Sequence, residues 1–258
     1  MEPEISTQLL EQYWRPPDHS IKPFFIKIKK GTYQEYIRVD KKKTNIFLIG
    51  EGMNTTIITG NRSFVDGNRT YDTATVGVAG NVSSTAIVKI YGTIDFICGD
   101  ATAVFQNCLI EARTPMARQY NTITSQHREL ESLPTGIVLQ NCTIKATRDL
   151  EKLNNVTTFL GRPWGIFSRT VIMESYIDNL IDPRGWVEWI ESANKSVVSR
   201  RPYYLEYKNR GPGAVTKGRV TWASVTTDPN IASDFTVRNF ISGDQWIPAN
   251  IPHYLDLS

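Results

Sequence analysis

Short runs of apolar residues, each ended by glycine or by turn-forming residues, dominate the chain from Phe24 onward. Phe24–Ile28 is mostly apolar, and Ile46–Gly50 and Thr56–Gly60 are rich in β-branched residues and end in glycine. Runs of this length and composition predict β-strands, and Gly31-Thr32-Tyr33 between two of them predicts a turn. Long amphipathic helical patterns are almost absent, so the sequence predicts an all-β architecture.

The start of the chain has a different pattern. Apolar residues recur there at helical spacing, at Ile5, Leu9, Leu10 and Tyr13. The prolines at positions 16 and 17 would end any helix. We therefore divide the chain into a divergent N-terminal segment, residues 1–21, and a β-rich domain, residues 22–258.

One segment of the β-rich domain recurs. Residues 105–112 (Phe-Gln-Asn-Cys-Leu-Ile-Glu-Ala) are repeated as residues 139–146 (Leu-Gln-Asn-Cys-Thr-Ile-Lys-Ala), at an offset of 34 residues. A repeat of this period indicates a solenoid, and a solenoid built from strands is a β-helix. Equivalent residues of successive coils stack, so we expect Asn107 over Asn141, and Cys108 over Cys142 as apolar fillers.

Composition restricts the function classes. The chain has 258 residues, 40% of them hydrophobic, and can bury most of its apolar surface without a metal or a disulfide. Its three cysteines and three histidines are too scattered for a metal site, and we expect no cofactor. The net charge of +3 suits an acidic partner such as a polyuronate, and equally a soluble protein with a few extra lysines. The basic runs are too short for a nucleic-acid site, no apolar run could cross a membrane, and we expect a monomer.

The sequence is rich in glycosylation sequons. The motif Asn-x-Ser/Thr occurs at Asn54, Asn61, Asn68, Asn81, Asn141, Asn155 and Asn194. Sequons matter only in a secreted chain, although asparagine and threonine are also common in turn-rich β proteins. The first fourteen residues lack the charged and then apolar pattern of a signal peptide.

Gly92–Gly99 is the first stretch that could carry chemistry. Side chains alternate along a strand, so with Ile94 and Phe96 facing the core, Asp95 and Ile97 would face outward. A carboxylate held on a rigid strand suits a nucleophile or a general base. A surface aspartate that only solubilises the sheet fits the same pattern.

Gly161-Arg162-Pro163-Trp164 is the second such stretch. Gly161 allows the backbone to turn and Pro163 fixes the exit, so Arg162 would project from a stiff loop. A guanidinium binds a carboxylate through two hydrogen bonds, and an indole ring can stack on a sugar. A structural arginine packed against Trp164 is the alternative.

These stretches resemble the plant-type pectinesterases, also called pectin methylesterases. The likeness covers about residues 22–258 and includes, in the same order, residues 30–35, 44–50, 56–62, 92–99, 161–164, 209–214 and 240–248. It implies a single-stranded right-handed parallel β-helix, the pectin lyase-like solenoid. It also implies a secreted cell-wall enzyme that hydrolyses galacturonate methyl esters of pectin to pectate and methanol, with a proteinaceous pectinesterase inhibitor as a possible partner.

The resemblance also implies roles for four residues. Asp95 would be the nucleophile that forms an acyl-enzyme, and Arg162 would hydrogen-bond it and keep it ionised. Trp164 would pack against the sugar. Gln126 falls where the family has a glutamine in a Thr-Ala-Gln-Gly stretch, and we assign it a supporting polar role in substrate binding.

The chain departs from the family pattern before the nucleophile. The family's Tyr-Gln-Asp-Thr-Leu segment, with its general-acid aspartate and oxyanion glutamine, has no match here. The chain runs from Gly80 almost directly into Ile87, so on the order of sixty residues, two to three coils, are missing near residues 80–86. Cys98 replaces the usual phenylalanine and Asp100 the usual asparagine. Asp100 could act as a substitute acid, although nothing in the sequence places it suitably.

The missing segment changes the functional expectation. General acid-base help is worth roughly 10²–10⁴-fold, and one oxyanion donor on the order of 10²–10³-fold. We therefore expect a feeble or inactive esterase, and the alternative is an inactive pectin-binding pseudoenzyme that keeps Arg162 and Trp164. A polyuronate lyase or glycosidase is disfavoured because the sequence shows neither calcium-binding carboxylate clusters nor suitably spaced acids.

Overall fold

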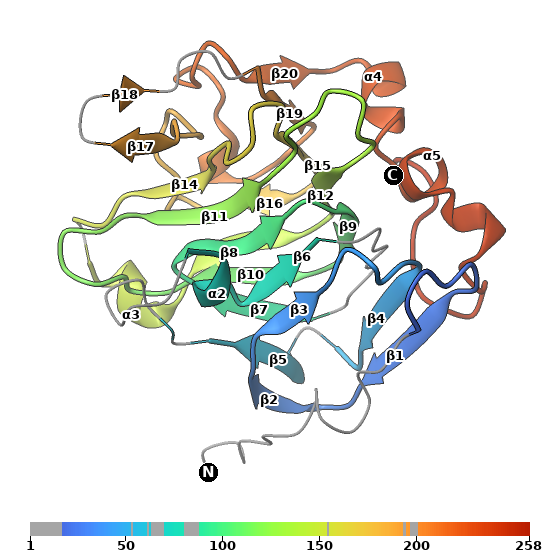
Figure 1. Cartoon of the computed structure of the whole chain (residues 1–258). Helices are drawn as coiled ribbons and strands as arrows, with labels where there is room; N and C mark the ends of the chain where they lie inside the picture. Colours follow the sequence, from blue (N-terminus) through green and yellow to red (C-terminus); the bar gives the residue numbers. More distant parts are fainter. Residues whose placement is uncertain are drawn as a thin grey trace.

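The computed structural model describes residues 17–52, 54–60, 62, 70–79, 88–153, 155–192, 195–196 and 201–258. Three parallel sheets follow the length of the molecule (Figure 1). The first sheet contains, in order, β16 (Tyr176–Ile177), β13 (Thr143–Ala146), β10 (Leu109–Ala112), β7 (Lys89–Gly92), β5 (Thr56–Thr59) and β2 (Gly31–Gln34). The second contains β14 (Thr158–Gly161), β11 (Asn121–Gln126), β8 (Ile94–Gly99), β6 (Val76–Val78) and β3 (Ile37–Val39). The third contains β20 (Ser224–Thr226), β19 (Tyr203–Tyr207), β15 (Arg169–Met173), β12 (Gly136–Gln140) and β9 (Thr102–Gln106).

The remaining elements are small. β1 (Phe24–Ile28) pairs with β4 (Ile46–Gly50) in parallel, and β17 (Ile190–Ser192) pairs with β18 (Lys195–Ser196) in an antiparallel hairpin. The short helices are α2 (Thr70–Thr73), α3 (Arg148–Glu151), η2 (Pro212–Ala214), α4 (Pro229–Ser233), α5 (Val237–Ile241) and η3 (Gly243–Gln245). No helix in the described part of the chain is long and apolar enough to cross a membrane.

Neighbouring strands in each sheet come from successive turns of one coil. Leu109 lies opposite Thr143, and Gln106 lies opposite Gln140, in the parallel register that the sequence repeat predicts. Cys108 and Cys142 form no disulfide, are fully buried and belong to the apolar core. The predicted parallel β-helix and the stacking of the two cysteines are therefore confirmed.

The local strand predictions are mostly confirmed. Phe24–Ile28 and Ile46–Gly50 are strands, as is Thr56–Thr59. The turn predicted at residues 31–33 is wrong, because this segment is strand β2 and pairs with β5 along its whole length. Pairing with the next coil outweighs the local turn preference of glycine and threonine. The helix predicted before Arg15 lies outside the described residues.

A ladder of left-handed residues marks one corner of the coils. Asn107 and Asn141 have φ values of 56° and 51°, and Glu174 and Lys208 continue the series at 55° and 45°. The Asn141 side-chain nitrogen donates a hydrogen bond to the Asn107 side-chain oxygen at 2.8 Å. Asparagine tolerates this conformation better than other residues with a β-carbon, so the repeated Asn-Cys pair fits the corner.

Asn141→Ala is expected to lower the free energy of unfolding by about 2 kcal/mol. About 1 kcal/mol comes from the left-handed conformation and about 1 kcal/mol from the lost hydrogen bond. Asn141→Gly loses the bond but adopts this conformation freely, so we expect a loss of only about 1 kcal/mol. Urea unfolding of both variants measures the difference, and equal losses would contradict the contribution of backbone strain.

The same hydrogen bond bears on the sequons. The Asn141 side-chain nitrogen is engaged in the ladder, whereas Asn54 and Asn155 are exposed. The other sequons, at Asn61, Asn68, Asn81 and Asn194, lie outside the described residues.

The coils before and after residues 80–87 pair directly. Ile58 of β5 lies opposite Ile90 of β7, and Val76 of β6 lies opposite Ile97 of β8. All four side chains belong to the same buried core cluster. The core is therefore continuous across this point in two of the three sheets. Residues 80–87 themselves lie outside the described part of the chain.

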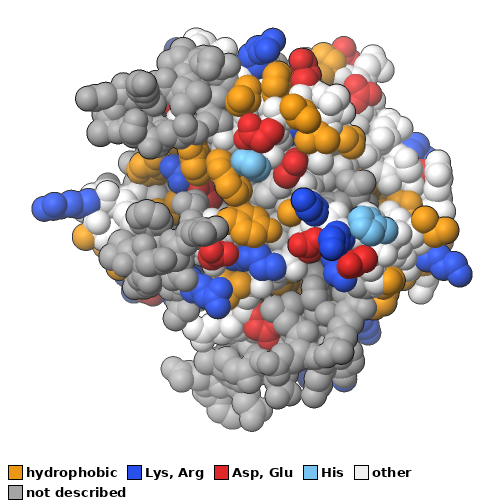
Figure 2. All heavy atoms as spheres, in the orientation of Figure 1, with side chains coloured by type: hydrophobic (Ala, Val, Ile, Leu, Met, Phe, Trp, Pro, Cys, Tyr) orange, Lys and Arg blue, Asp and Glu red, His pale blue; other side chains and the backbone are white. Residues whose placement is uncertain are grey.

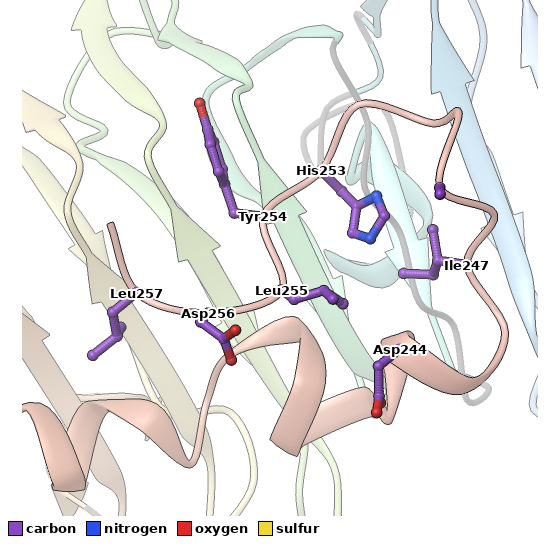
Figure 3. A pocket seen from close by; sticks show the side chains of 8 residues that line it. Asp244, Ile247, His253, Tyr254, Leu255, Asp256 and Leu257 are labelled. Carbon is purple, nitrogen blue, oxygen red and sulfur yellow. The ribbon is translucent and has the colours of Figure 1, made fainter.

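The C-terminal segment covers the third sheet. Its last residues form hydrogen bonds with polar side chains of three successive coils. Gln106 bonds to the backbone of Tyr254, and Gln140 donates to the Asp256 carbonyl at 3.1 Å. Glu174 accepts from the Ser258 nitrogen at 2.8 Å. Between this segment and η3 lies a cavity of about 460 Å³ (Figure 3), lined by Asp244, Ile247, Ala249, His253, Tyr254, Leu255, Asp256 and Leu257. These residues are not among those that the sequence analysis singled out for chemistry.

Candidate active site

Asp95 lies at a bulge in β8. Thr122 and Thr124 of β11 are opposite Ile94 and Ile97, so β8 has one more residue than its neighbour over this stretch. Asp95 has a φ of 52°, in the left-handed region. Bulges are common beside active sites, where the extra residue re-aims a side chain.

The bulge changes the alternation that the sequence predicts. Phe96 faces the core, as expected, but its neighbour Ile97 belongs to the same buried cluster. Ile94 is only half-buried and is not part of that cluster. The predictions that Ile94 faces the core and Ile97 faces outward are therefore wrong, because the extra residue shifts the side-chain register.

The Asp95 carboxylate is held by Arg162. The Arg162 Nε donates to Oδ1 and Oδ2 at 3.0 and 3.1 Å, and Nη2 donates to Oδ2 at 2.6 Å. The Thr122 hydroxyl donates to Oδ1 at 2.7 Å and accepts from the Asp95 backbone nitrogen at 3.0 Å. The Asp95 side chain is 1% exposed and that of Arg162 16%, so the carboxylate is fixed in one orientation under the guanidinium.

The loop after β14 presents Arg162. Its backbone nitrogen donates to the Thr124 carbonyl at 3.0 Å. A β-carbon on Gly161 would lie 2.1 Å from the Thr124 hydroxyl, so only glycine fits there. Burial lowers the pKa of Arg162, but the charge and hydrogen bonds of Asp95 outweigh burial and raise this pKa above its ordinary value.

Aromatic side chains gather around Arg162. Its guanidinium lies 4.2 Å from the centre of the Trp189 ring, and Trp189 stacks on Trp164 at 6.0 Å with an interplanar angle of 20°. The ring centres of Tyr71 and His127 lie 6.1 and 4.1 Å from the centre of the Trp164 ring. Figure 2 shows hydrophobic side chains gathered among acidic and basic ones on the side of the molecule that it displays. Such a surface suits a charged sugar polymer.

The sequence matches the Pectinesterase family over residues 7–89 and 86–244. This chain belongs to the pectinesterase family. The two matched segments meet at residues 86–89, next to the point where the motif comparison finds the missing stretch.

Known relatives agree with this assignment. Pectinesterase/pectinesterase inhibitor PPE8B of Prunus persica is 38% identical over 296 residues, covering 94% of this chain and 56% of that protein. Probable pectinesterase 30 of Arabidopsis thaliana is 38% identical over 289 residues, covering 92% of this chain and 57% of that protein. The structure of a pectin methylesterase from carrot superposes with a TM-score of 0.71 and 35% identity, covering 94% of this chain and 91% of the carrot chain.

The relatives are longer than this chain. It spans about half the length of the curated relatives that it matches. The alignment with the Prunus persica protein also spans 296 positions, more than the 258 residues available here, so that pectinesterase has positions without a counterpart in this chain.

Within this pectinesterase fold, Gln126 is fully buried. Its side-chain oxygen accepts from the backbone nitrogens of Arg128 at 3.0 Å and Arg169 at 2.8 Å. Its side-chain nitrogen lies 3.5 Å from Asp100 and 3.4 Å from Thr135. Gln126 is thus held in the interior by its own hydrogen bonds, and its role in substrate binding, like those of Arg162 and Trp164, stays a prediction.

Asp100 lies beyond the end of β8, bonded to Thr135. It is five positions from Asp95, and a strand rises about 3.3 Å per residue, so the two carboxylates are separated by roughly 15 Å along the strand. The structure therefore gives no support to Asp100 as a substitute acid.

Sequence reasoning missed several residues of this site. Trp189, Tyr71 and Tyr120 come from other coils, and the Tyr120 hydroxyl accepts from Arg162 Nη1 at 3.4 Å. Tyr71 and Tyr120 have ordinary local contexts, so no motif marks them. The Trp-x-x-Trp spacing of Trp186 and Trp189 was the available signal: Trp186 is fully buried, and Trp189 lies at the site.

Proposed function

We propose that this chain is a pectinesterase that hydrolyses the C6 methyl esters of galacturonate in pectin, with Asp95 as the nucleophile. The observation that carries the proposal is the buried ion pair between Asp95 and Arg162, which lies beside a cluster of aromatic rings. A carboxylate held rigidly against a cation, next to surfaces that stack on sugars, suits attack on a sugar ester.

The reaction would run in two halves. A carboxylate oxygen of Asp95 attacks the ester carbonyl carbon, and methanol leaves as an acyl-enzyme anhydride forms. Water then attacks the anhydride, releasing the galacturonate carboxyl and restoring Asp95. Arg162 holds the carboxylate in place through both halves, since its hydrogen bonds reach both oxygens.

Substrate binding would use the aromatic cluster. Trp164 and Trp189 present nearly parallel rings 6.0 Å apart, and each is half-buried with part of its surface in solvent. A galacturonate ring can pack on such a surface, while neighbouring arginines attract the acidic residues of partly de-esterified pectin.

We expect the rate to be low. In the described part of the chain, the groups that hydrogen-bond the Asp95 carboxylate are Arg162 and Thr122, and neither supplies a carboxylic acid to protonate methoxide. The segment that the family resemblance assigns to this task has no counterpart in the sequence. Losing acid help and one oxyanion donor together would cost roughly 10⁴-fold or more in rate.

Methanol release from highly methylated pectin tests the proposal, with carrot pectin methylesterase as the reference. The expected result is slow release that is proportional to the amount of chain and well above a heat-denatured blank. Binding of the same pectin, measured by affinity electrophoresis, separates the alternatives. Binding without methanol release would contradict the esterase and indicate a pectin-binding pseudoenzyme.

Location and partners follow from the same proposal. The plant relatives and the sequons favour a secreted protein of the cell wall, where methylated pectin is found. Several relatives carry "pectinesterase inhibitor" in their names, and we propose a proteinaceous inhibitor of this kind as a partner. The chain would act as a monomer, because an esterase site built within one coil stack needs no second copy.

A further inference from the structure

Among the described residues, the groups that hydrogen-bond the Asp95 carboxylate, Arg162 and Thr122, do not supply a carboxylic acid for the leaving group. The assignment of such an acid rests on the proposed esterase function. In the same described part of the chain, the acidic or imidazole side chains on this side of the molecule include Asp100, His127 and Asp72. Asp100 is bonded to Thr135 beyond the end of β8, and His127 is paired with Glu129 beyond the end of β11. The third is Asp72, on helix α2.

Helix α2 contacts β8, and β6, the strand that follows α2, pairs directly with β8. Val76 of β6 lies opposite Ile97 of β8. Ala74 and Asp95 each lie two residues before this pair, so they are neighbours at the same end of the two strands. Asp72 precedes Ala74 by two residues, so its Cα lies within roughly 12 Å of that of Asp95. The side chains and a methyl ester together can fill that span.

Helix α2 lies on the outer face of the sheet. It packs against β8, and Figure 1 shows it in front of β6 and β8. Tyr71 fixes this position, because its ring lies 3.1 Å from where a β-carbon on Gly77 would be. The Arg38 guanidinium lies over the Tyr71 ring, 5.1 Å from its centre, and the centres of the Tyr71 and Trp164 rings are 6.1 Å apart. A β-carbon at position 77 would require the Tyr71 ring or the Arg38 side chain to shift by a few tenths of an ångström.

The buried thiol of Cys98 lies within the electrostatic reach of both carboxylates. Burial raises its pKa, Asp95 and Asp72 raise it further, and Arg38 opposes them. Cys98 pairs with Gly77 across the strands, directly under Tyr71. Because the charges of both Asp95 and Asp72 act on the Cys98 thiol, the two carboxylates lie in the same neighbourhood of β8.

We infer that Asp72 is the catalytic acid of this site, placed there by the direct pairing of β6 with β8. In the first half of the reaction Asp95 bonds to the ester carbon, the bond from that carbon to the methoxy oxygen breaks, and the methoxy oxygen takes the proton of the Asp72 carboxyl. Methanol leaves. In the second half the Asp72 carboxylate takes a proton from water as its oxygen attacks the acyl carbon. The bond to Asp95 breaks, and both aspartates return to their starting states.

The leaving group provides a sharp test. Methoxide is strongly basic and needs a proton to depart, whereas 4-nitrophenolate departs without one. Asp72→Asn is therefore expected to lower kcat for methyl-esterified oligogalacturonate by about 100-fold, and for a 4-nitrophenyl galacturonate ester by less than about 3-fold. Asp72→Glu, which keeps the carboxyl group, is expected to recover part of the lost rate on the methyl ester.

Asp40→Asn is the matched control. Asp40 follows β3, which β6 separates from β8, and it is exposed and accepts a hydrogen bond from the Lys42 nitrogen at 3.0 Å. We expect its rates on both esters to equal those of the parent. Thermal unfolding of each variant checks that the fold is intact.

The outcomes separate the two proposals. If the parent chain releases no methanol, the esterase function fails and the role of Asp72 fails with it. If the parent is active and Asp72→Asn is within about 2-fold of it on the methyl ester, only the role of Asp72 is overturned. Equal losses on both esters would also overturn it, because they would show damage to the site rather than loss of a proton donor.

Discussion

Asp95→Asn is expected to reduce methanol release to the level of the blank. The amide keeps the size and two of the polar contacts of the carboxylate but cannot form an acyl-enzyme. Removing one member of a hydrolase's catalytic set typically costs on the order of 10⁴-fold in kcat. The substitution leaves the largely buried Arg162 guanidinium beside a neutral side chain, which lowers stability, so rates are measured well below the unfolding temperature of the variant. Pectin binding should persist, since the aromatic cluster is untouched.

A second aspartate-arginine pair provides the matched control. Asp256 accepts two hydrogen bonds of 2.8 Å from Arg238, on the C-terminal segment that covers a different sheet. Asp256→Asn makes the same change of charge beside an arginine, away from β8. We expect methanol release to equal that of the parent. Retained activity in Asp95→Asn, or an equal loss in both variants, would contradict Asp95 as the nucleophile.

Much of the architecture could be predicted because the information is local or repeated. The apolar runs define β1 and β4, and the repeated Asn-Cys pair gives the coil length and the stacking of Asn141 on Asn107. The bulge at Asp95 could not be predicted. A strand with one extra residue has the same composition as a regular one, and only the pairing with β11 reveals it. Alternation therefore misplaced Ile94 and Ile97.

The candidate site shows the same division. Asp95 and Arg162 are 67 positions apart, and their meeting was predicted only from the family resemblance of the two motifs. Nothing around Trp189 or Tyr71 in the sequence links them to Trp164, because they reach it through the stacking of other coils. The position of α2 could not be predicted either. It depends on which strand pairs with β6, and local sequence patterns do not determine this pairing.

The contact between Arg162 and Asp95 should also dominate local stability. Arg162→Ala removes three hydrogen bonds and leaves a carboxylate with 1% exposure beside only the Thr122 hydroxyl. Removing one partner of a buried ion pair typically costs about 3–5 kcal/mol, because the remaining charge has neither water nor a counter-charge. For a chain of this size we expect the unfolding temperature to fall by roughly 10 °C.

Combining Arg162→Ala with Asp95→Asn isolates the cause of that loss. The double variant has no unpaired buried charge, so we expect it to be more stable than Arg162→Ala alone, by about 1–3 kcal/mol in urea unfolding. Arg162→Lys should fall between the parent and Arg162→Ala, since an ammonium keeps the charge but cannot bond both carboxylate oxygens through a planar fork. Strictly additive losses in the double variant would show that Arg162 stabilises the loop by packing on Trp189. That result would contradict the proposal that the ion pair with Arg162 holds the Asp95 carboxylate in position for attack.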